Sequence, residues 1–194
     1  MEFSSGNLYH VYNQGNNRVR IFYDRANYLY FLKKMRLYLL NHSELIAWCL
    51  MPNHFHWLIR VNDNYDDIIS SSGISCDKLI KPLNRNISTL LSSYTRGMNK
   101  SYGKTGSLFR GKTKAKLITG NDKFDDEYAL SCFLYIHLNP INAGLGSRIE
   151  EWEFSSYRDY IGARNGTLCN TRLGRELLGL PEDKDEFRLL LDRR

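Results

Sequence analysis

Two apolar runs of β-strand type, residues 45–51 and 54–61, meet at Pro52-Asn53 and constrain the fold more than any other feature. Branched and aromatic side chains dominate both runs, and such side chains favour strands. A Pro-Asn pair between two strands is typical of a turn. The sequence therefore predicts a β-hairpin, or a sharply bent strand, at this point.

The second of these runs carries two histidines, His54 and His56, separated by Phe55. Because side chains alternate along a strand, both histidines project from one face and Phe55 from the other. Two neutral imidazoles on one face can hold a divalent metal ion. The pair alone does not distinguish a metal site from two packed histidines. His10 and His42 have no partner by spacing, and we expect both to be structural.

Residues 125–138 have a helical pattern, and Pro140 is expected to end the helix because the residue before a proline avoids helical geometry. Four residues recur at three- or four-residue spacing and so share one face of this helix: Tyr128, Cys132, Tyr135 and Asn139. His137 lies only two residues from Tyr135, so we expect it on the opposite side, packed or at the surface. Spacing alone does not separate a catalytic tyrosine from a packing one.

Five short motifs follow one another in order between residues 8 and 160. They are residues 9–17 (YHVYNQGNN), 51–56 (MPNHFH), 106–111 (GSLFRG), 135–140 (YIHLNP) and 152–157 (WEFSSY). Together these motifs resemble those of REP-associated tyrosine transposases, which belong to the single-tyrosine HUH transposase family, U being a bulky apolar residue. Gln14 stands where many relatives carry arginine, and Lys112 stands near a position often held by arginine. Both departures concern DNA contacts.

The resemblance implies that His54 and His56 are metal ligands, that Asn139 is a third ligand and that Tyr135 is the nucleophile. The implied cofactor is Mg²⁺ or Mn²⁺, because imidazole and amide oxygen suit either ion. The implied activity is metal-dependent cutting and rejoining of single-stranded DNA beside a hairpin, through a 5′-phosphotyrosine. Two other classes stay open: a non-catalytic DNA-hairpin-binding regulator, and a metal nuclease that uses activated water.

Positive charge is concentrated between Asp77 and Asp122, where ten basic residues and no acidic residue occur. This window carries +10, whereas the whole chain carries +6. Such a block predicts a nucleic-acid footprint. Six of its residues are the expected DNA contacts: Arg96, Lys100, Lys104, Arg110, Lys112 and Lys114. Tyr94, Tyr102 and Phe109 lie in the same window, where they either stack on unpaired bases or pack in the core.

The order of elements predicts an α+β two-layer sandwich, with one antiparallel sheet and helices on one face, and the resemblance implies the same RNA-recognition-like, ferredoxin-like fold. The expected strands are residues 8–12, 45–51, 54–61 and 114–119. The expected helices are residues 25–41, 87–102 and 125–138, with a loop at 62–77. A composition shift at 162–167 predicts a linker, which divides residues 1–162, the transposase-like domain, from a small helical tail at 163–194.

A length of 194 residues fits one domain with a sizeable core. No apolar run is long enough to span a membrane, and no secretory segment is evident, so we expect a bacterial-type cytoplasmic protein. The four cysteines are scattered without a CxxC pair, which argues against a zinc finger or a disulfide framework. The expected partner is single-stranded DNA with a hairpin. The sequence leaves open whether the Tyr135 helix completes its own site or a partner's, as in a homodimer.

Overall fold

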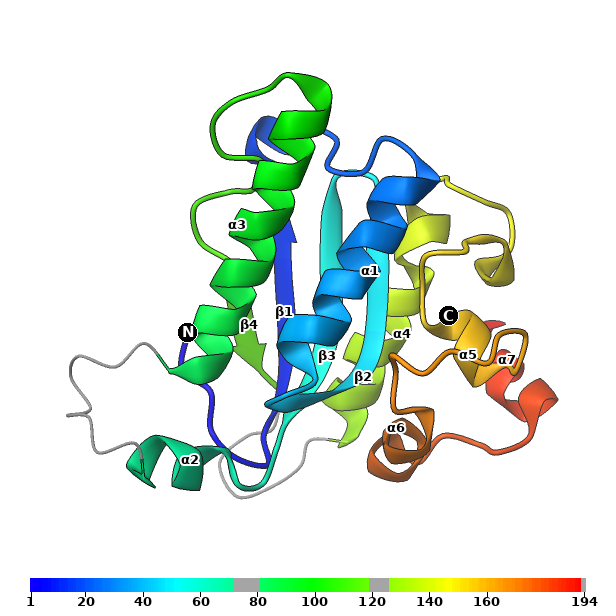
Figure 1. Ribbon diagram of the computed structural model, residues 1–194. Coiled ribbons are helices and arrows are strands. Elements are labelled where there is room, and N and C mark those ends of the chain that lie inside the picture. Colours follow the sequence, from blue (N-terminus) through cyan, green and yellow to red (C-terminus); the bar gives the residue numbers. More distant parts are fainter. Residues whose placement is uncertain (72–80, 119–125, 193–194) are drawn as a thin grey trace.

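A four-stranded antiparallel sheet forms the centre of the computed structural model, which describes residues 1–71, 81–118 and 126–192 (Figure 1). The strands are β1 (Leu8–Gln14), β2 (Ser43–Met51), β3 (His54–Val61) and β4 (Lys114–Leu117), in the spatial order β2-β3-β1-β4. β2 and β3 form the predicted hairpin, whose register runs from Ser43 opposite Val61 to Met51 opposite His54. β3 has the bounds that the sequence predicts.

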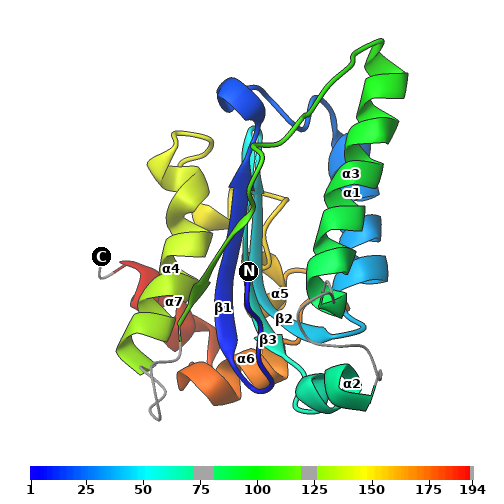
Figure 2. The same ribbon diagram turned by 90° about the vertical axis from the view of Figure 1, so that its left-hand side faces the viewer.

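Helices cover both faces of the sheet (Figure 2). α1 (Arg25–Leu39) and α3 (Pro82–Tyr102) lie on one face, and α4 (Asp126–Asn142) lies on the other. The α+β class and the antiparallel sheet are confirmed. The expectation of helices on one face only is corrected, because β3 is buried on both faces and a sheet of that kind needs a second cover.

Aromatic packing joins α1 and α3 to the sheet. The Phe31 ring of α1 lies 5.6 Å from the Phe55 ring and 6.0 Å from the Trp57 ring of β3. The same ring meets Tyr94 of α3 edge to face, with 4.8 Å between centroids. Tyr94 and Phe109, two of the aromatic residues in the basic window, are buried here and pack rather than face solvent.

Two boundaries in the middle of the chain differ from the predicted ones. α3 begins at Pro82 rather than at residue 87, because a proline in the first turn needs no N–H donor. It ends before Gly103, as predicted, and Gly103 takes the left-handed φ of 60°. A short helix, α2 (Tyr65–Ser71), occupies part of the predicted loop at 62–77, and Tyr65 anchors it by accepting a hydrogen bond from the Leu83 N–H. Residues 72–77 lie outside the described residues.

α4 continues past Pro140 to Asn142, so the predicted stop at Pro140 is wrong. The proline removes one backbone donor, but the turn that follows is closed by other bonds. The Leu145 N–H donates to the Pro140 carbonyl at 2.9 Å, and Gly144 then ends the turn with a φ of 67°. Asn139 therefore lies inside a formed helix rather than at a frayed end.

The C-terminal segment packs on the main body. Its helices are α5 (Tyr157–Tyr160), α6 (Thr171–Leu178) and α7 (Lys184–Asp192). A short 3₁₀ turn precedes it at Ile149–Glu151, and another follows β1 at Asn16–Arg18. Phe187 of α7 is buried, with its ring 5.6 Å from that of Tyr160. In the expected linker, Thr167 accepts hydrogen bonds from Arg36. In the ranges described above, no helix is both long and apolar enough to cross a membrane.

Candidate active site

His54 and His56 project from β3 toward α4. The alternation of the strand places Phe55 on the other face, against α1. The His54 and His56 rings lie 5.1 Å apart and nearly perpendicular to each other. Only 6% of the His56 surface is exposed, whereas His54 is partly buried.

α4 brings Tyr135 and Asn139 to the two histidines. The Tyr135 ring meets the His56 ring edge to face at 5.4 Å, and Asn139 Oδ1 lies 3.1 Å from His54 Nε2. One helical turn separates Tyr135 from Asn139, which matches the separation of the two histidines along the strand. The four residues expected to carry the chemistry thus meet at one place within a single chain.

His10 of β1 is a fifth member of this cluster, and the expectation that it has no partner is wrong. Its Nε2 lies 2.9 Å from Nδ1 of His56, and its ring lies 6.1 Å from that of Tyr135. The contact depends on strand pairing, since β1 lies beside β3 with His10 opposite Leu58 and diagonal to His56. Residue spacing along the sequence cannot predict a contact made across two paired strands.

Burial keeps these histidines neutral. It lowers the pKa of His56 to about 2, with smaller contributions from His10 and His54. It also lowers the pKa of His10 to about 4, helped by the nearby Lys116, and lowers the pKa of His54 below its usual value. A neutral imidazole has a lone pair that a cation can accept.

The contacts of His54 fit a cation. Its Nδ1 lies 2.7 Å from Asn53 Oδ1 and its Nε2 lies 3.1 Å from Asn139 Oδ1, so both ring nitrogens face amide oxygens. A neutral imidazole has one N–H, and it therefore satisfies only one of the two oxygens. Asn53 Nδ2 donates to the Arg18 carbonyl at 3.4 Å, which turns Oδ1 toward His54. With the proton on Nδ1, two lone pairs would converge between His54 Nε2 and Asn139 Oδ1, where a divalent ion would accept both.

Among the described residues, no group of three or more His, Cys, Asp or Glu side chains could hold a metal ion. The donor set at this place is instead two imidazoles and one amide oxygen. All three donors are neutral, so they would leave the charge of a divalent ion largely undiminished.

A cavity of about 220 Å³ opens beside these groups, and we call it the Tyr135 cavity. Its lining is Tyr12, Asn13, Gln14, His54, His56, Arg110, Lys112, Lys114 and Tyr135. No carboxylate belongs to this lining in the part of the chain that the structure describes. With 48% of its surface exposed, Tyr135 is accessible to a large substrate.

A second hollow, of about 750 Å³, runs between α3 and residues 106–113, and we call it the α3 groove. It shares Asn13, Arg110 and Lys112 with the Tyr135 cavity, so the two are neighbours. Arg96 also lines the groove. Asn13 Nδ2 donates to the Arg110 carbonyl at 3.2 Å, which holds this loop against β1. The basic residues Arg110 and Lys112 therefore lie beside both hollows.

The expected DNA contacts therefore divide into two sets. Arg96, Arg110, Lys112 and Lys114 line the cavity or the groove, whereas the linings do not include Lys100 and Lys104. Lys104 Nζ instead donates to the Tyr23 hydroxyl at 2.7 Å. Sequence reasoning missed Arg18 and Arg20, which lie with His54 around a separate hollow outside the basic window.

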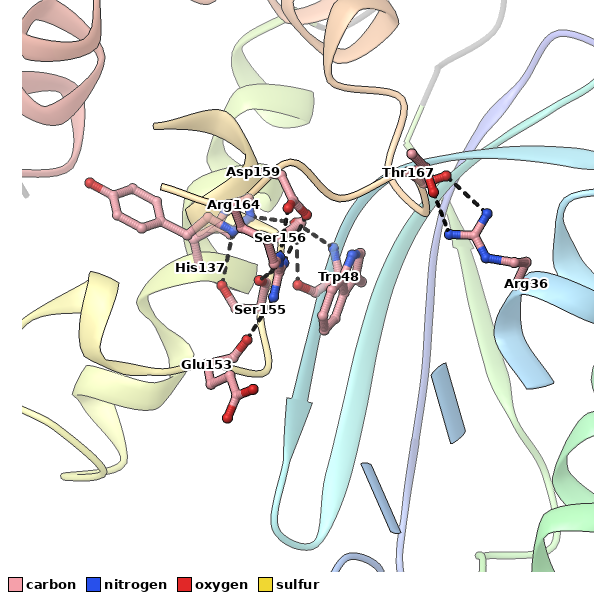
Figure 3. A network of polar contacts seen from close by, with 10 residues as sticks. Arg36, Trp48, His137, Glu153, Ser155, Ser156, Asp159, Arg164 and Thr167 are labelled. Carbon is pink, nitrogen blue, oxygen red and sulfur yellow. Dashed lines mark hydrogen bonds and ion pairs between the residues drawn. The ribbon is translucent and has the colours of Figure 1, made fainter. Parts of the chain in front are cut away.

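His137 lies on the far side of α4, in a buried polar network (Figure 3). Its Nδ1–H donates to the Phe133 carbonyl at 3.0 Å, and its Nε2 accepts from the Ser156 hydroxyl at 2.8 Å. Ser156 Oγ also accepts from the Trp48 N–H of β2 at 2.9 Å. The expectation that His137 is packed away from Tyr135 is confirmed, and the contact ties α4 to the sheet.

Comparison with known proteins yields similarity in structure alone. No family model and no curated protein sequence matches the chain. A solved REP-associated tyrosine transposase bound to a REP hairpin is similar over 85% of this chain and 84% of its own, with a TM-score of 0.59 and 16% identity. A bacterial tRNA(His) guanylyltransferase-like protein in complex with GTP is similar over 73% and 68%, with a TM-score of 0.40 and 12% identity. The first similarity shows a shared fold.

Proposed function

We propose that this protein is a metal-dependent, single-tyrosine transposase that cuts and rejoins single-stranded DNA beside a hairpin. One observation carries the proposal: an accessible tyrosine, two neutral imidazoles and an amide oxygen lie together beside a cavity whose lining includes Arg110, Lys112 and Lys114. The sequence motifs support it, as does the fold shared with a transposase that is bound to a REP hairpin.

The DNA strand is held by positive charge along the α3 groove and the Tyr135 cavity. Arg110 and Lys112 line both hollows, and Lys114 lines the cavity, so the phosphates meet cations at each step toward Tyr135. A single strand suits the cavity better than a duplex, because a stacked duplex resists the bend needed to present one phosphate. The hairpin stem is the double-stranded element that the protein binds beside the cleavage point.

His54 Nε2, His56 Nε2 and Asn139 Oδ1 would hold the divalent ion. When bound, Mg²⁺ or Mn²⁺ would withdraw charge from the scissile phosphate as a Lewis acid. The protein contributes the neutral state of both imidazoles, which burial enforces. It also contributes the fixed place of Asn139 inside α4.

Tyr135 acts as the nucleophile. Its phenolic oxygen forms a bond to phosphorus, while the bond from phosphorus to the 3′ oxygen of the preceding nucleotide breaks. The phenol releases its proton to solvent, which reaches this exposed side chain, and the departing 3′ oxygen takes up a proton. The products are a 5′-phosphotyrosine and a free 3′-hydroxyl.

Rejoining reverses these steps. The 3′-hydroxyl of another strand attacks the phosphotyrosine, and Tyr135 departs with a proton. Because a phosphodiester is exchanged for a phosphodiester of similar energy, no nucleotide cofactor is required.

The experiment uses hairpin oligonucleotides from the DNA flanking the gene, labelled at the 5′ or the 3′ end, with Mn²⁺ or with EDTA. Denaturing gels compare the parent protein with Tyr135→Phe and with Tyr128→Phe, a matched control because both tyrosines belong to one face of α4. We expect a protein–DNA adduct on the 3′-labelled fragment in the parent and in Tyr128→Phe only.

Two results would overturn the proposal. Cutting without an adduct that survives in Tyr135→Phe would make the protein a nuclease that uses activated water. Hairpin binding without any cutting, across Mg²⁺ and Mn²⁺, would make it a binding module.

A further inference from the structure

Each proposed histidine ligand has its second ring nitrogen in contact with another side chain. His56 Nδ1 lies 2.9 Å from His10 Nε2, and His54 Nδ1 lies 2.7 Å from Asn53 Oδ1. An imidazole has two nitrogens, and the contact made by one decides which of them carries the proton. We infer that His10 and Asn53 are positioning residues that hold His56 and His54 in their metal-binding tautomers.

Asn53 acts on His54 through an orientation fixed by the backbone. Its main-chain carbonyl accepts from the Gly15 N–H at 2.8 Å, and its Nδ2 donates to the Arg18 carbonyl at 3.4 Å. Arg18 has a φ of 61°, which is uncommon for a residue other than glycine. This strained turn supplies the acceptor that turns Asn53 Oδ1 toward His54. His54 therefore donates from Nδ1 and keeps the Nε2 lone pair on the Asn139 side.

His10 acts on His56, and two arrangements of one shared proton are possible. If His10 donates to His56, then His56 carries its own proton on Nε2 and has no lone pair for a cation. If His56 donates from Nδ1, then its Nε2 lone pair is free and His10 is the acceptor. A metal ion on His56 requires the second arrangement. The Tyr12 ring, 4.9 Å from the His10 ring, helps to hold His10 in place on β1.

This inference rests on the proposed function, but it concerns residues that touch neither the phosphate nor the metal. Residues behind metal ligands typically contribute 10- to 100-fold to metal affinity. Two substitutions remove the contact: His10→Phe keeps an aromatic ring without an acceptor, and Asn53→Ala removes the oxygen. One conservative substitution restores it: His10→Gln supplies an amide oxygen as the acceptor.

The experiment measures Mn²⁺ binding to the full-length protein without DNA, from the electron paramagnetic resonance signal of unbound Mn²⁺. We expect His10→Phe and Asn53→Ala to weaken Mn²⁺ binding about tenfold or more, and His10→Gln to stay within about threefold of the parent. Hairpin binding in EDTA should be equal in all variants, which shows that they fold. Parent-like Mn²⁺ affinity in both His10→Phe and Asn53→Ala would overturn the inference.

The failure of the inference differs from the failure of the proposed function. If the parent binds no Mn²⁺, or if His54→Ala and His56→Ala bind it unchanged, the metal site itself is wrong and the inference falls with it. If only His10 and Asn53 prove dispensable, the function stands and the inference is overturned. Nitrogen-15 NMR of the parent with Mg²⁺ needs no variant: a proton on Nδ1 of His56 supports the inference, and a proton on Nε2 overturns it.

Discussion

Tyr135 and His137 are two residues apart on α4 and lie in opposite environments. Tyr135 is 48% exposed beside His56, whereas His137 is fully buried and accepts a hydrogen bond from Ser156. The helix thus presents one face to the Tyr135 cavity and another to the buried network that joins it to β2 through Ser156. Phe133, one turn before His137 on α4, also meets the Phe187 ring of α7, with 6.2 Å between the ring centroids.

We expect Ser156→Ala to lower the free energy of unfolding by about 1–3 kcal/mol, because it leaves the buried His137 Nε2 and the Trp48 N–H without their partner. Urea denaturation measures the effect. Ser92→Ala, at an exposed position of α3, is the matched control and should change stability by less than about 0.5 kcal/mol. Equal midpoints for the two variants would contradict the anchoring role of Ser156.

Stability should fall in mild acid because buried histidines stay neutral in the folded protein. Burial lowers the pKa of His137 from 6.5 to about 3, so the unfolded chain binds the extra proton between these values. The free energy of unfolding is therefore unaffected by protonation of this histidine above pH 6.5. As the pH falls from 6.5 toward 3, the free energy of unfolding decreases by up to about 1.4 kcal/mol per pH unit for each such histidine.

His137→Gln tests this pH dependence in EDTA. The variant should be less stable than the parent at pH 7.5, but its free energy of unfolding should fall less steeply between pH 6.5 and 4.5, by about 1.4 kcal/mol per pH unit. Parallel curves for parent and variant would show that His137 is not a source of the acid sensitivity.

Substitution of the proposed metal ligands should abolish DNA cutting without abolishing hairpin binding. We expect His54→Ala and His56→Ala to reduce Mn²⁺-dependent adduct formation below detection, while hairpin affinity in EDTA stays near that of the parent. Asn139→Ala should raise the Mn²⁺ concentration needed for half-maximal adduct formation, by a smaller factor than either histidine variant. A Mn²⁺ titration that Asn139→Ala leaves unchanged would remove this residue from the site.

Lys112 should contact a DNA phosphate, since it lines both the Tyr135 cavity and the α3 groove. Lys112→Ala should reduce the slope of log affinity against log salt by about 0.7–0.9, the amount expected for one lost phosphate contact. Fluorescence anisotropy with a labelled hairpin over a KCl series measures the slope. Lys33→Ala, at an exposed position of α1, is the control and should leave the slope unaltered. If Lys112→Ala also leaves the slope unaltered, Lys112 does not contact the DNA.

The side-chain alternation in β3 and the helical period of α4 were enough to group His54 with His56 and Tyr135 with Asn139. Both groupings follow from the local geometry of a strand or a helix, so the positions of the residues in the sequence are enough to predict them. The hairpin at Pro52-Asn53 followed from the same kind of local signal. The expectation that Tyr135 and the histidines meet needed the sheet and helix to pack as the family resemblance implied.

Contacts across strands and turns could not be predicted in this way. His10 reaches His56 only because β1 pairs with β3 in one register, and a shift of one residue would place His10 on the other face. Asn53 faces His54 because of the unusual backbone at Arg18, which no sequence pattern marks. Pro140 was misread because tertiary contacts and closure of the next turn outweighed its local preference.

The central claim is that Tyr135 becomes covalently linked to DNA, and peptide mass spectrometry of the adduct tests it most directly. The parent protein is incubated with hairpin DNA and Mn²⁺, digested with nuclease and trypsin, and searched for peptides that carry a nucleotide. We predict a 5′-phosphonucleotide on Tyr135. A nucleotide on Tyr12 or Tyr128 instead, or cut DNA without any modified peptide, would contradict the account.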